Sequence, residues 1–304
     1  MATEDSTPVG DTPRRNRTVC LIAGAGHSGS TLLGLALGAH PDVFYAGEAR
    51  KSTFFGNENK PLRKRMCKVC GPECRVWKGL EVGGDVDLYE ALSRRTGRSV
   101  VVDSTKSLDW LEAQTATVAA RGARLVLVFL GRDGRAVVGS GLRKYPAKSV
   151  REHAEKWVAQ MEGTAAFASH FPGEVVHVRY EELATRPEAT LRRVAEALAI
   201  PFDAAMLDPF SSEQHPLGGN AGTQSLLART QTKADGALPI SGSKKDYYQQ
   251  HPKDFVLDLR WRHELSAEAL ADFEEVAGAL NRRYAWEELA PETPPTHTPP
   301  TESP

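Results

Sequence analysis

The glycine-rich segment after the first apolar run constrains this chain more than any other feature. The apolar residues Thr18–Ala23 lead into Gly24–Thr31 (GAGHSGST), and the amphipathic stretch Ser30–Gly38 follows at once. This order predicts a strand, a tight turn and a helix in direct succession. Such a unit directs several backbone N–H groups and the positive end of the helix at one point. The segment therefore predicts a binding site for phosphate or sulfate.

The rest of the chain alternates short apolar runs with amphipathic stretches. Further strands are predicted at Ser99–Val102, Arg124–Leu130 and Glu174–Val178. Further helices are predicted at Asp85–Arg95, Leu108–Ala120, Val150–Ser169, Pro187–Ala199 and Ser266–Arg283. The run Leu125–Leu130 is continuously apolar, which is typical of a strand covered by helices on both faces. We therefore expect an α/β fold with a central parallel sheet flanked by helices.

The two ends of the chain contain few apolar residues and are predicted to be disordered. Residues 1–17 are polar, and residues 291–304 alternate proline and threonine with almost nothing to bury. One domain is therefore expected at residues 18–290. The first apolar run is too short for a membrane span, and no convincing cleavage site of a signal peptide follows it.

Charge and cysteine content exclude several classes of protein. Lys and Arg total 38 against 39 for Asp and Glu, so the basic field of a general nucleic-acid binder is absent. Any anion site must therefore be local. The 4 cysteines do not form the dense framework of a small secreted domain, and we expect a reduced, cytoplasmic location.

Two common nucleotide-binding patterns compete for the glycine-rich segment. The segment matches the Walker A pattern except that Ser30 stands where the lysine must be, which argues against hydrolysis of ATP or GTP. Gly24, Gly26 and Gly29 satisfy the Rossmann fingerprint, and Glu48 supplies an acidic residue downstream. A dinucleotide site is therefore an open alternative.

A third interpretation rests on the hydroxyl groups of the segment, which exceed what a dinucleotide site requires. His27–Leu33 (HSGSTLL), followed by HPDV at 40–43 and Gly-Glu at 47–48, resembles the opening of sulfotransferases that use 3′-phosphoadenosine 5′-phosphosulfate (PAPS). The resemblance implies a P-loop-like sulfotransferase fold. It also implies that the 5′-phosphosulfate is bound by His27, Ser28, Gly29, Ser30, Thr31 and Leu32.

His27 departs from the pattern of that family, whose members usually carry arginine or lysine at this position. A neutral imidazole donates one hydrogen bond and carries no charge. Phosphosulfate binding is therefore expected to depend on other cations or on a protonated His27.

A second anion site is predicted at the end of the strand Arg124–Leu130. Arg132 follows this strand at the edge where open α/β sheets bind ligands, and Ser140 lies two helical turns further on. The planar fork of arginine can bind a terminal phosphate through two hydrogen bonds. The resemblance implies that Arg132 and Ser140 bind the 3′-phosphate of PAPS. The alternative is a salt bridge between Arg132 and Asp133 at a helix start.

The same resemblance implies catalytic roles for three residues. Lys106, after the strand Ser99–Val102, corresponds to a lysine that contacts the transferring group, and His27 would help to neutralise the developing charge. Glu48, in HPDVFYAGE at 40–48, matches the glutamate that acts as base in tyrosylprotein and several bacterial sulfotransferases. The alternatives are a solvated lysine and a surface carboxylate.

Three of the cysteines, Cys67, Cys70 and Cys74, lie close together in a basic segment. One Cys-x-x-Cys pair with a third cysteine is half of a zinc site, so His40 or another residue would have to complete tetrahedral coordination. Because the sequence contains no second pair, free thiols or a local disulfide are favoured over a structural zinc.

Together these features predict an enzyme that transfers a sulfuryl group from PAPS to an acceptor hydroxyl by in-line displacement, with no metal in the chemistry. The resemblance covers most of residues 18–286 and includes HPLGGN at 215–220. An NAD(P)-dependent oxidoreductase and a non-catalytic nucleotide-binding module are the alternatives. The expected partner is a hydroxyl-bearing substrate rather than nucleic acid or a membrane. Neither the class of acceptor nor the oligomeric state follows from the sequence.

Overall fold

A single parallel sheet forms the centre of the molecule. In the computed structural model the described residues are 13–83, 86–228 and 252–287, and within them five strands pair in the order β2-β3-β1-β4-β5. The strands are β1 (Thr18–Ala23), β2 (Val43–Gly47), β3 (Val100–Asp103), β4 (Arg124–Gly131) and β5 (Glu174–Arg179). β1 is buried along its whole length and β4 beyond its first residue, because helices cover both faces.

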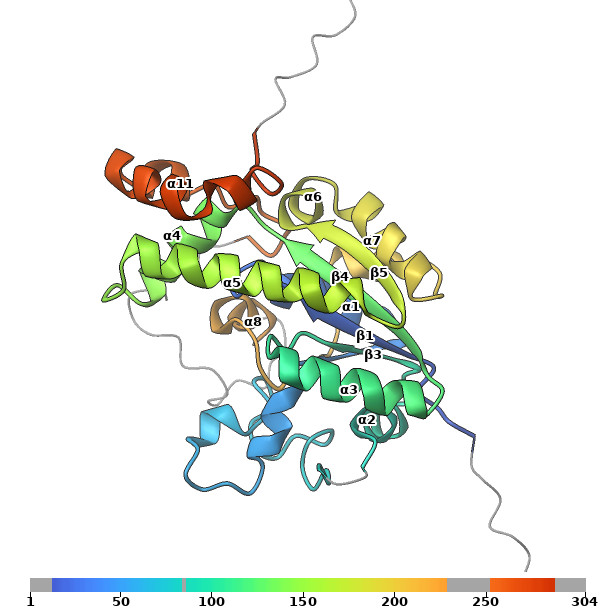
Figure 1. The fold of residues 1–304 in the computed structure, drawn as a ribbon. Helices are drawn as coiled ribbons and strands as arrows, with labels where there is room; N and C mark the ends of the chain where they lie inside the picture. The colour runs from blue at the N-terminus through green and yellow to red at the C-terminus, as the bar shows by residue number, and fades with distance from the viewer. Residues whose placement is uncertain (1–12, 84–85, 229–251, 288–304) are drawn as a thin grey trace, which may run out of the picture.

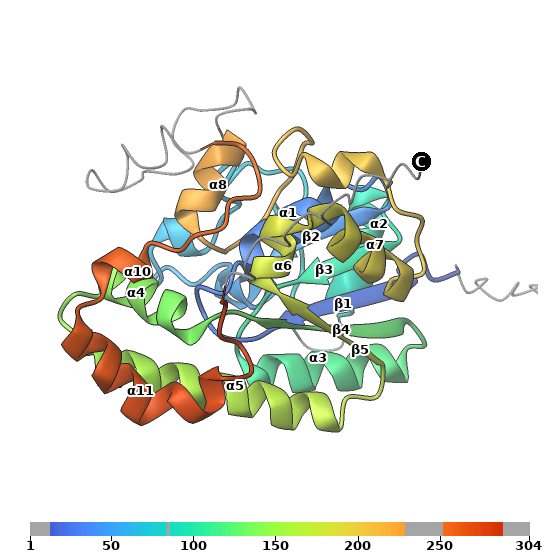
Figure 2. The same ribbon diagram turned by 90° about the horizontal axis from the view of Figure 1, so that it is seen from above.

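Helices form a layer on each side of this sheet. Their bounds are α1 (Ser30–Gly38), α2 (Leu88–Thr96), α3 (Leu108–Ala120), α4 (Gly134–Lys144), α5 (Val150–Ser169), α6 (Tyr180–Thr185), α7 (Pro187–Ala197), α8 (Ala221–Ala228), α10 (Trp261–Glu264) and α11 (Ala267–Asn281). α1 and α7 cover one face and α3 and α5 the other, with α2 beside α3 and α11 packed on the outside of α5 (Figures 1 and 2). None of the helices described is both long enough and apolar enough to cross a membrane.

The predicted α/β class and parallel sheet are confirmed. β1, α1, α3 and α5 have the predicted bounds, and most other elements shift by a few residues. β2 was not among the predicted strands, because it is short, lies at the sheet edge and ends in Ala46 and Gly47. The stretch after Pro201 was predicted to be irregular, but within it the structure has the 3₁₀ helix η3 (Ala204–Leu207) and α8.

The N-terminal boundary differs from the prediction where the structure describes it. Asn16 is buried, and its backbone N–H donates to the Glu90 carboxylate at 2.7 Å. The Arg17 N–H donates to the Ser99 carbonyl at 2.8 Å, which continues the line of β1 toward β3. Residues 13–17 are therefore part of the fold, since the N–H groups of Asn16 and Arg17 pair with Glu90 and Ser99, which no local pattern predicts. Residues 1–12 and the predicted tail, 291–304, lie outside the described residues.

Strand order decides between the nucleotide-binding patterns. In a Rossmann sheet the second strand lies beside the first, so that an acidic residue at its end can reach the ribose. Here β3 lies between β1 and β2, which places Glu48 two strands away from the glycine-rich segment. This order argues against the dinucleotide alternative.

All five strands point the same way, so their carboxyl ends meet at one edge of the sheet. The glycine-rich segment follows β1, Glu48 follows β2, Lys106 lies just beyond β3, Arg132 follows β4 and Tyr180 follows β5. Ligands bind at this edge in open α/β sheets, near the point where the connections after two neighbouring strands lead in opposite directions. Here these strands are β1, whose connection leads to β2, and β4, whose connection leads to β5 on the other side.

Candidate active site

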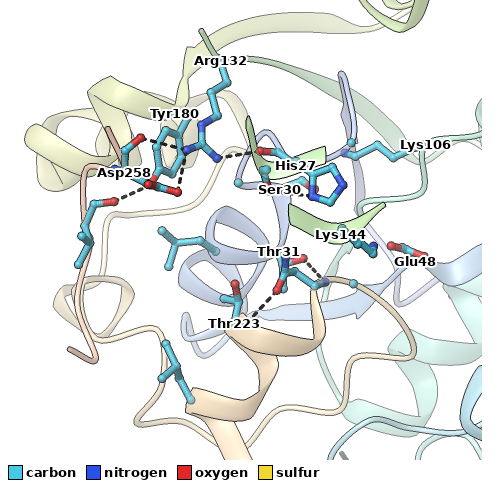
Figure 3. Close-up of a pocket in the computed structure, with 18 of the residues that line it drawn as sticks. His27, Ser30, Thr31, Glu48, Lys106, Arg132, Lys144, Tyr180, Thr223 and Asp258 are labelled. Atoms are coloured by element: carbon cyan, nitrogen blue, oxygen red, sulfur yellow. Dashed lines mark hydrogen bonds and ion pairs between the residues drawn. The ribbon is translucent and has the colours of Figure 1, made fainter. Parts of the chain in front are cut away.

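A pocket at the carboxyl edge of the sheet collects nearly all the predicted site residues (Figure 3). The predicted residues that line it are His27, Gly29, Ser30, Thr31, Leu32, Glu48, Lys106, Arg132 and Ser140. Ser28 lies behind the lining: it is fully buried, and its hydroxyl has no hydrogen-bond partner. The fold thus brings together residues that follow four different strands.

The glycine-rich segment presents the start of α1 to the pocket. Gly29 is the N-cap, with φ of 89°, and no side chain caps the helix. A Cβ atom at Gly29 would lie 2.5 Å from Cδ2 of Tyr180, so glycine is required both by the backbone conformation and by the space. The N–H groups of the first helical turn have no acceptor within the helix. This end of α1 can therefore bind an anion.

His27 joins the two predicted anion sites. Its backbone has the left-handed conformation, with φ of 66°. The Arg132 Nη1 atom donates to the His27 carbonyl oxygen at 2.8 Å, and the Ser140 hydroxyl lies 3.2 Å from the His27 Nδ1 atom. The three residues that the sequence assigned to two phosphates are thus linked directly, Arg132 through the His27 backbone and Ser140 through the His27 ring.

Arg132 is held at the pocket by an aromatic ring and a carboxylate. Its guanidinium group lies 4.0 Å from the centre of the Tyr180 ring, and its Nη2 atom lies 3.3 Å from the Asp258 carboxylate. The Nε atom is buried without a hydrogen-bond partner. The alternative of an Arg132–Asp133 salt bridge is wrong, because Asp133 pairs with Arg135 at 2.6 Å.

Positive charge exceeds negative charge around Asp258. Besides Arg132, the carboxylate has Arg260 at 2.7 Å and Arg143 at 3.7 Å. Burial alone would raise the pKa of Asp258, but the hydrogen bond from Arg260 and the charge of Arg132 hold it well below its usual range. Asp258 is therefore a stable anion among three guanidinium groups, and this part of the pocket can accept a further anion.

Lys106 lies beneath the glycine-rich segment. Its Nζ atom donates to the Ile22 carbonyl oxygen at 2.9 Å, near the end of β1. Burial lowers the pKa of Lys106 to about 8, although the charges of Glu48 and Asp103 oppose this shift. The amine is therefore a cation at neutral pH that loses its proton under mildly alkaline conditions.

Glu48 lies at the pocket beside β2. Its Oε2 atom forms an ion pair with the Lys51 Nζ atom at 2.6 Å, and both side chains are partly exposed. A Cβ atom on Gly218 would lie 2.6 Å from the Lys51 Nζ atom and 2.9 Å from the Glu48 Cβ atom, so the loop at Gly218 passes directly against this pair. The Glu48 carboxylate thus lies beside the cationic Lys51 side chain and close to the backbone of the loop at Gly218.

The end of β3 fixes the backbone on both sides of Glu48. The buried Asp103 carboxylate accepts the Ala49 N–H at 3.1 Å, and the Ser104 N–H donates to the Gly47 carbonyl at 2.8 Å. Asp103 also accepts hydrogen bonds from the Tyr89 hydroxyl and the Trp110 indole, both at 2.9 Å. Asp103 is therefore a positioning residue for Glu48.

Sequence reasoning missed several residues of the pocket. They include Lys51 and Asp103 beside Glu48, and in the lining Lys144, Tyr180, Asn220, Asp258 and Arg260. Lys144 had a usable signal, since it lies one helical turn after Ser140 on α4. Asn220, whose N–H donates to the Thr31 hydroxyl at 2.9 Å, lies in the HPLGGN segment that the resemblance includes, but nothing in the sequence placed it beside Thr31.

The cysteine cluster contains a fourth residue that the sequence did not identify. The ligand atoms of Cys67, Cys70, Cys74 and His215 all lie within 4.8 Å of one another. His40, which the sequence suggested for this position, is engaged elsewhere: its Nε2 atom lies 3.0 Å from the Pro201 carbonyl, and its Nδ1 atom accepts the Asp42 N–H. All four cysteines of the chain are free thiols.

Comparison with known proteins agrees with the motifs. The family described as Sulfotransferase family matches residues 122–204, which include Arg132 and Ser140. A putative protein-tyrosine sulfotransferase of Caenorhabditis briggsae is 24% identical over 192 residues, which are 61% of this chain and 67% of that protein.

Two solved structures share the fold across most of the chain. The sulfotransferase domain of the Synechococcus PCC 7002 olefin synthase has a TM-score of 0.56 at 17% identity, covering 91% of this chain and 98% of that one. The sulfotransferase domain of the curacin biosynthetic pathway has a TM-score of 0.53 at 16% identity, covering 88% and 98%. Residues 122–204 thus match the sulfotransferase family by sequence, and the chain as a whole has the fold of these sulfotransferase domains.

Proposed function

We propose that this chain transfers a sulfuryl group from PAPS to the hydroxyl group of an acceptor. The observation that carries the proposal is the meeting of Arg132 and Ser140 with His27 in one pocket. A donor with phosphate groups at both its 3′ and 5′ positions needs two neighbouring anion sites, whereas NAD or ATP needs no anion site at a 3′ position.

The residues present fit such a donor. The uncapped start of α1 and the unpartnered hydroxyl of Ser28 suit the 5′-phosphosulfate, for which the glycine-rich segment supplies amides and hydroxyls. Arg132 and Ser140 would bind the 3′-phosphate, for which the buried Nε atom of Arg132 remains without a partner. Lys144 and Arg260 line the same pocket and add positive charge.

In the proposed reaction the acceptor oxygen forms a bond to sulfur while the bond from sulfur to the 5′-phosphate oxygen breaks. Glu48 would accept the proton of the acceptor hydroxyl, since its carboxylate lines the pocket beside β2. Lys106 and His27 would neutralise charge on the transferring and leaving oxygens. These roles need no metal ion. The products are the sulfated acceptor and adenosine 3′,5′-bisphosphate.

The proposal also includes one catalytic domain, a hydroxyl-bearing acceptor and a cytoplasmic location. We take the described residues up to 287 as one catalytic domain, since most of the buried apolar residues form one continuous core. The acceptor is a hydroxyl-bearing molecule, and the protein named above as a putative protein-tyrosine sulfotransferase makes peptide tyrosine one class to test. We also propose a cytoplasmic location, because the 4 cysteines do not form the dense disulfide framework of a small secreted domain.

A thermal-shift panel tests the proposal, because a ligand that binds the native state raises its melting temperature. Adenosine 3′,5′-bisphosphate should stabilise the chain more than ATP, NAD or NADP at the same concentration. Transfer of labelled sulfate from PAPS to a panel of phenols, sugars and tyrosine peptides then tests catalysis. Stabilisation by NAD alone would overturn the proposal. Binding of the bisphosphate without transfer to any acceptor would favour a non-catalytic nucleotide-binding module.

A further inference from the structure

The cluster of Cys67, Cys70, Cys74 and His215 has the composition and the closeness of a closed metal site. Zinc binds thiolates at about 2.3 Å and imidazole at about 2.0 Å, so the ligand atoms of a tetrahedral site lie about 3.5 to 4 Å apart. Here the Nδ1 atom of His215 lies 3.1 Å from Sγ of Cys70 and 3.6 Å from Sγ of Cys74. Small shifts of buried side chains would therefore complete the geometry.

The backbone around Cys67 supports a thiolate ligand. The N–H groups of Val69 and Cys70 donate to the Cys67 sulfur at 3.4 and 3.5 Å. The chain then turns tightly, with the Gly71 N–H donating to the Cys67 carbonyl at 3.2 Å and Gly71 at φ of 76°. Amide donors to a sulfur stabilise its charged form, which is the form that binds metals.

His215 is oriented as metal-binding histidines usually are. Its Nδ1 atom faces the sulfurs, and its Nε2 atom lies 3.4 Å from the Glu213 carboxylate. A carboxylate on the second ring nitrogen fixes the tautomer and the orientation of a histidine ligand. The His215 carbonyl accepts the Trp77 indole N–H at 2.6 Å, which anchors the backbone as well.

One metal ion explains this cluster better than a disulfide does. A disulfide would join two of the three thiols. The third thiol would then lie beside His215 with no atom that both of these groups bind. Cys67, Cys74 and His215 are buried, so an unsatisfied group there is costly. We propose that Cys67, Cys70, Cys74 and His215 bind one structural Zn²⁺ ion. Since the chain supplies all four ligands, the site has no open position for catalysis.

The location of the proposed zinc site indicates that the ion stabilises an irregular segment of the chain. Between Ala49 and Leu80 the chain has only the short 3₁₀ helices η1 (Ala49–Phe54) and η2 (Leu62–Lys64). The backbone hydrogen bonds of this segment, which we call the insertion (residues 49–80), are mostly local turns, and the bond from the Lys68 N–H to the Pro216 carbonyl at 3.1 Å links it to the loop before Leu217. Small irregular segments of this kind commonly depend on a metal or a disulfide. The zinc ion would join the insertion to the loop at 213–220.

This loop continues directly into the wall of the candidate active site. The Leu217 N–H donates to the Ala46 carbonyl at 2.9 Å on β2, and Gly218 lies against Glu48 and Lys51. Asn220 then bonds to Thr31. Loss of the metal is therefore expected to loosen the side of the pocket near Glu48, although the metal touches no reacting group.

Metal analysis of the full chain tests the proposal without reference to activity. Protein expressed with zinc in the medium and purified under reducing conditions should contain about one zinc ion per chain. Replacement by Co²⁺ should give the visible bands of a tetrahedral thiolate site. The proposal is wrong if zinc stays below about a tenth of an ion per chain and the reduced protein takes up neither Zn²⁺ nor Co²⁺. It is equally wrong if mass spectrometry finds a disulfide within the cluster and reduction does not restore metal binding.

Variants locate the site and separate it from general effects of cysteine loss. Cys74→Ser and His215→Ala should each lower the zinc content at least about tenfold. Cys20→Ala is the matched control: Cys20 is also a buried thiol, but it lies on β1 and should keep full zinc content. Glu213→Gln should retain zinc and weaken its affinity about 10- to 100-fold. If a ligand variant does not fold, the metal content and the Co²⁺ spectrum of the wild-type chain still decide the question.

Discussion

The two sides of the pocket are built in different ways. What we propose as the donor side consists of the glycine-rich segment and Arg132, which lie in turns that directly join a strand to a helix, and of Ser140 on α4. The proposed acceptor side, formed by Glu48, the insertion and the loop at 213–220, is largely irregular. A backbone hydrogen bond to the Asp103 carboxylate and contacts within the cysteine–histidine cluster hold it in place.

This difference explains why a short sequence motif predicts one side of the pocket better than the other. On the donor side the chemistry and the backbone geometry are encoded in the same few residues, so a short motif carries both. On the acceptor side the Glu48 carboxylate, which we propose as the base, follows a local motif, but the groups that hold it come from segments far away in the chain. We expect changes on the donor side to affect nucleotide binding and changes on the acceptor side to affect turnover.

The largest effect is expected for Glu48→Gln on the acceptor side. The amide keeps the shape of the side chain but cannot accept the acceptor proton, so turnover should fall about 10²- to 10⁴-fold. The affinity for adenosine 3′,5′-bisphosphate should stay within about twofold, measured by calorimetry alongside a steady-state transfer assay. Near-native turnover would exclude Glu48 as the base.

Arg132→Ala tests the donor side. Loss of a charged hydrogen-bonding partner should weaken binding of adenosine 3′,5′-bisphosphate about 10- to 100-fold and leave binding of 5′-AMP nearly unchanged. Arg124→Ala is the matched control, because Arg124 begins the same strand at the opposite edge and forms an exposed pair with Glu174. Equal losses for the two nucleotides would remove the assignment of Arg132 to the 3′-phosphate.

Lys106 lies between the two sides, and its titration gives a pH test. Its pKa of about 8 is below the ordinary 10.5, so the cation is present below pH 8 and is lost above it. Nucleotide affinity should therefore fall up to about tenfold per pH unit above 8. Lys106→Arg should remove this dependence by keeping the charge. A wild-type affinity that is constant from pH 7 to 9.5 would contradict the assigned role.

The same shift predicts the sign of a stability change. Between pH 8 and 10.5 the unfolded chain holds a proton on Lys106 that the folded chain has released. The free energy of unfolding contributed by this group should therefore rise with pH across this window. The comparison of wild-type and Lys106→Met chains by denaturant titration at pH 7.5 and 10 measures it, and a difference that is the same at both pH values would refute the shift.

The smallest effect is expected for Lys51→Ala. Its ion pair with Glu48 is partly exposed, and pairs of this kind contribute little because water screens them. Turnover should change less than about fivefold, and nucleotide binding should not change. A loss as large as that of Glu48→Gln would show that Lys51 itself belongs to the catalytic machinery and that the acceptor side depends on a pair of charges.

The bounds of strands and helices could be predicted from the sequence wherever the hydrophobic periodicity lies within one segment. The bounds of β1 and α1 were predicted because an apolar run, a glycine turn and an amphipathic stretch follow one another without interruption. β2 was missed because a short edge strand has little periodicity of its own. The packed residues 13–17 were missed because polar residues gave no sign that Ser99 and Glu90 would pair with their backbone.

In the candidate site, too, residues within a local motif could be predicted from the sequence, and residues from distant segments could not. Arg132 and Ser140 could be found because Arg132 directly follows a clear strand and the resemblance implies a serine two helical turns further on. His215 could not be assigned to the cysteine cluster, since it lies far along the chain from Cys67 and the distance between them is a property of the fold. The same holds for Asp258, which contacts Arg132 from the segment before α10.

The sequence by itself determined the α/β class, the glycine-rich turn at Gly24–Thr31 and the types of residue that follow the strand ends. These features follow from local backbone preferences and from the types of the side chains, and both depend only on residues that are close together in the sequence. Only the tertiary structure decided that β3 separates β1 from β2, that Asp103 holds the backbone beside Glu48, and that His215 joins the three cysteines. Strand order and such distant contacts depend on how buried surfaces pack across the whole chain, and no short segment encodes that packing.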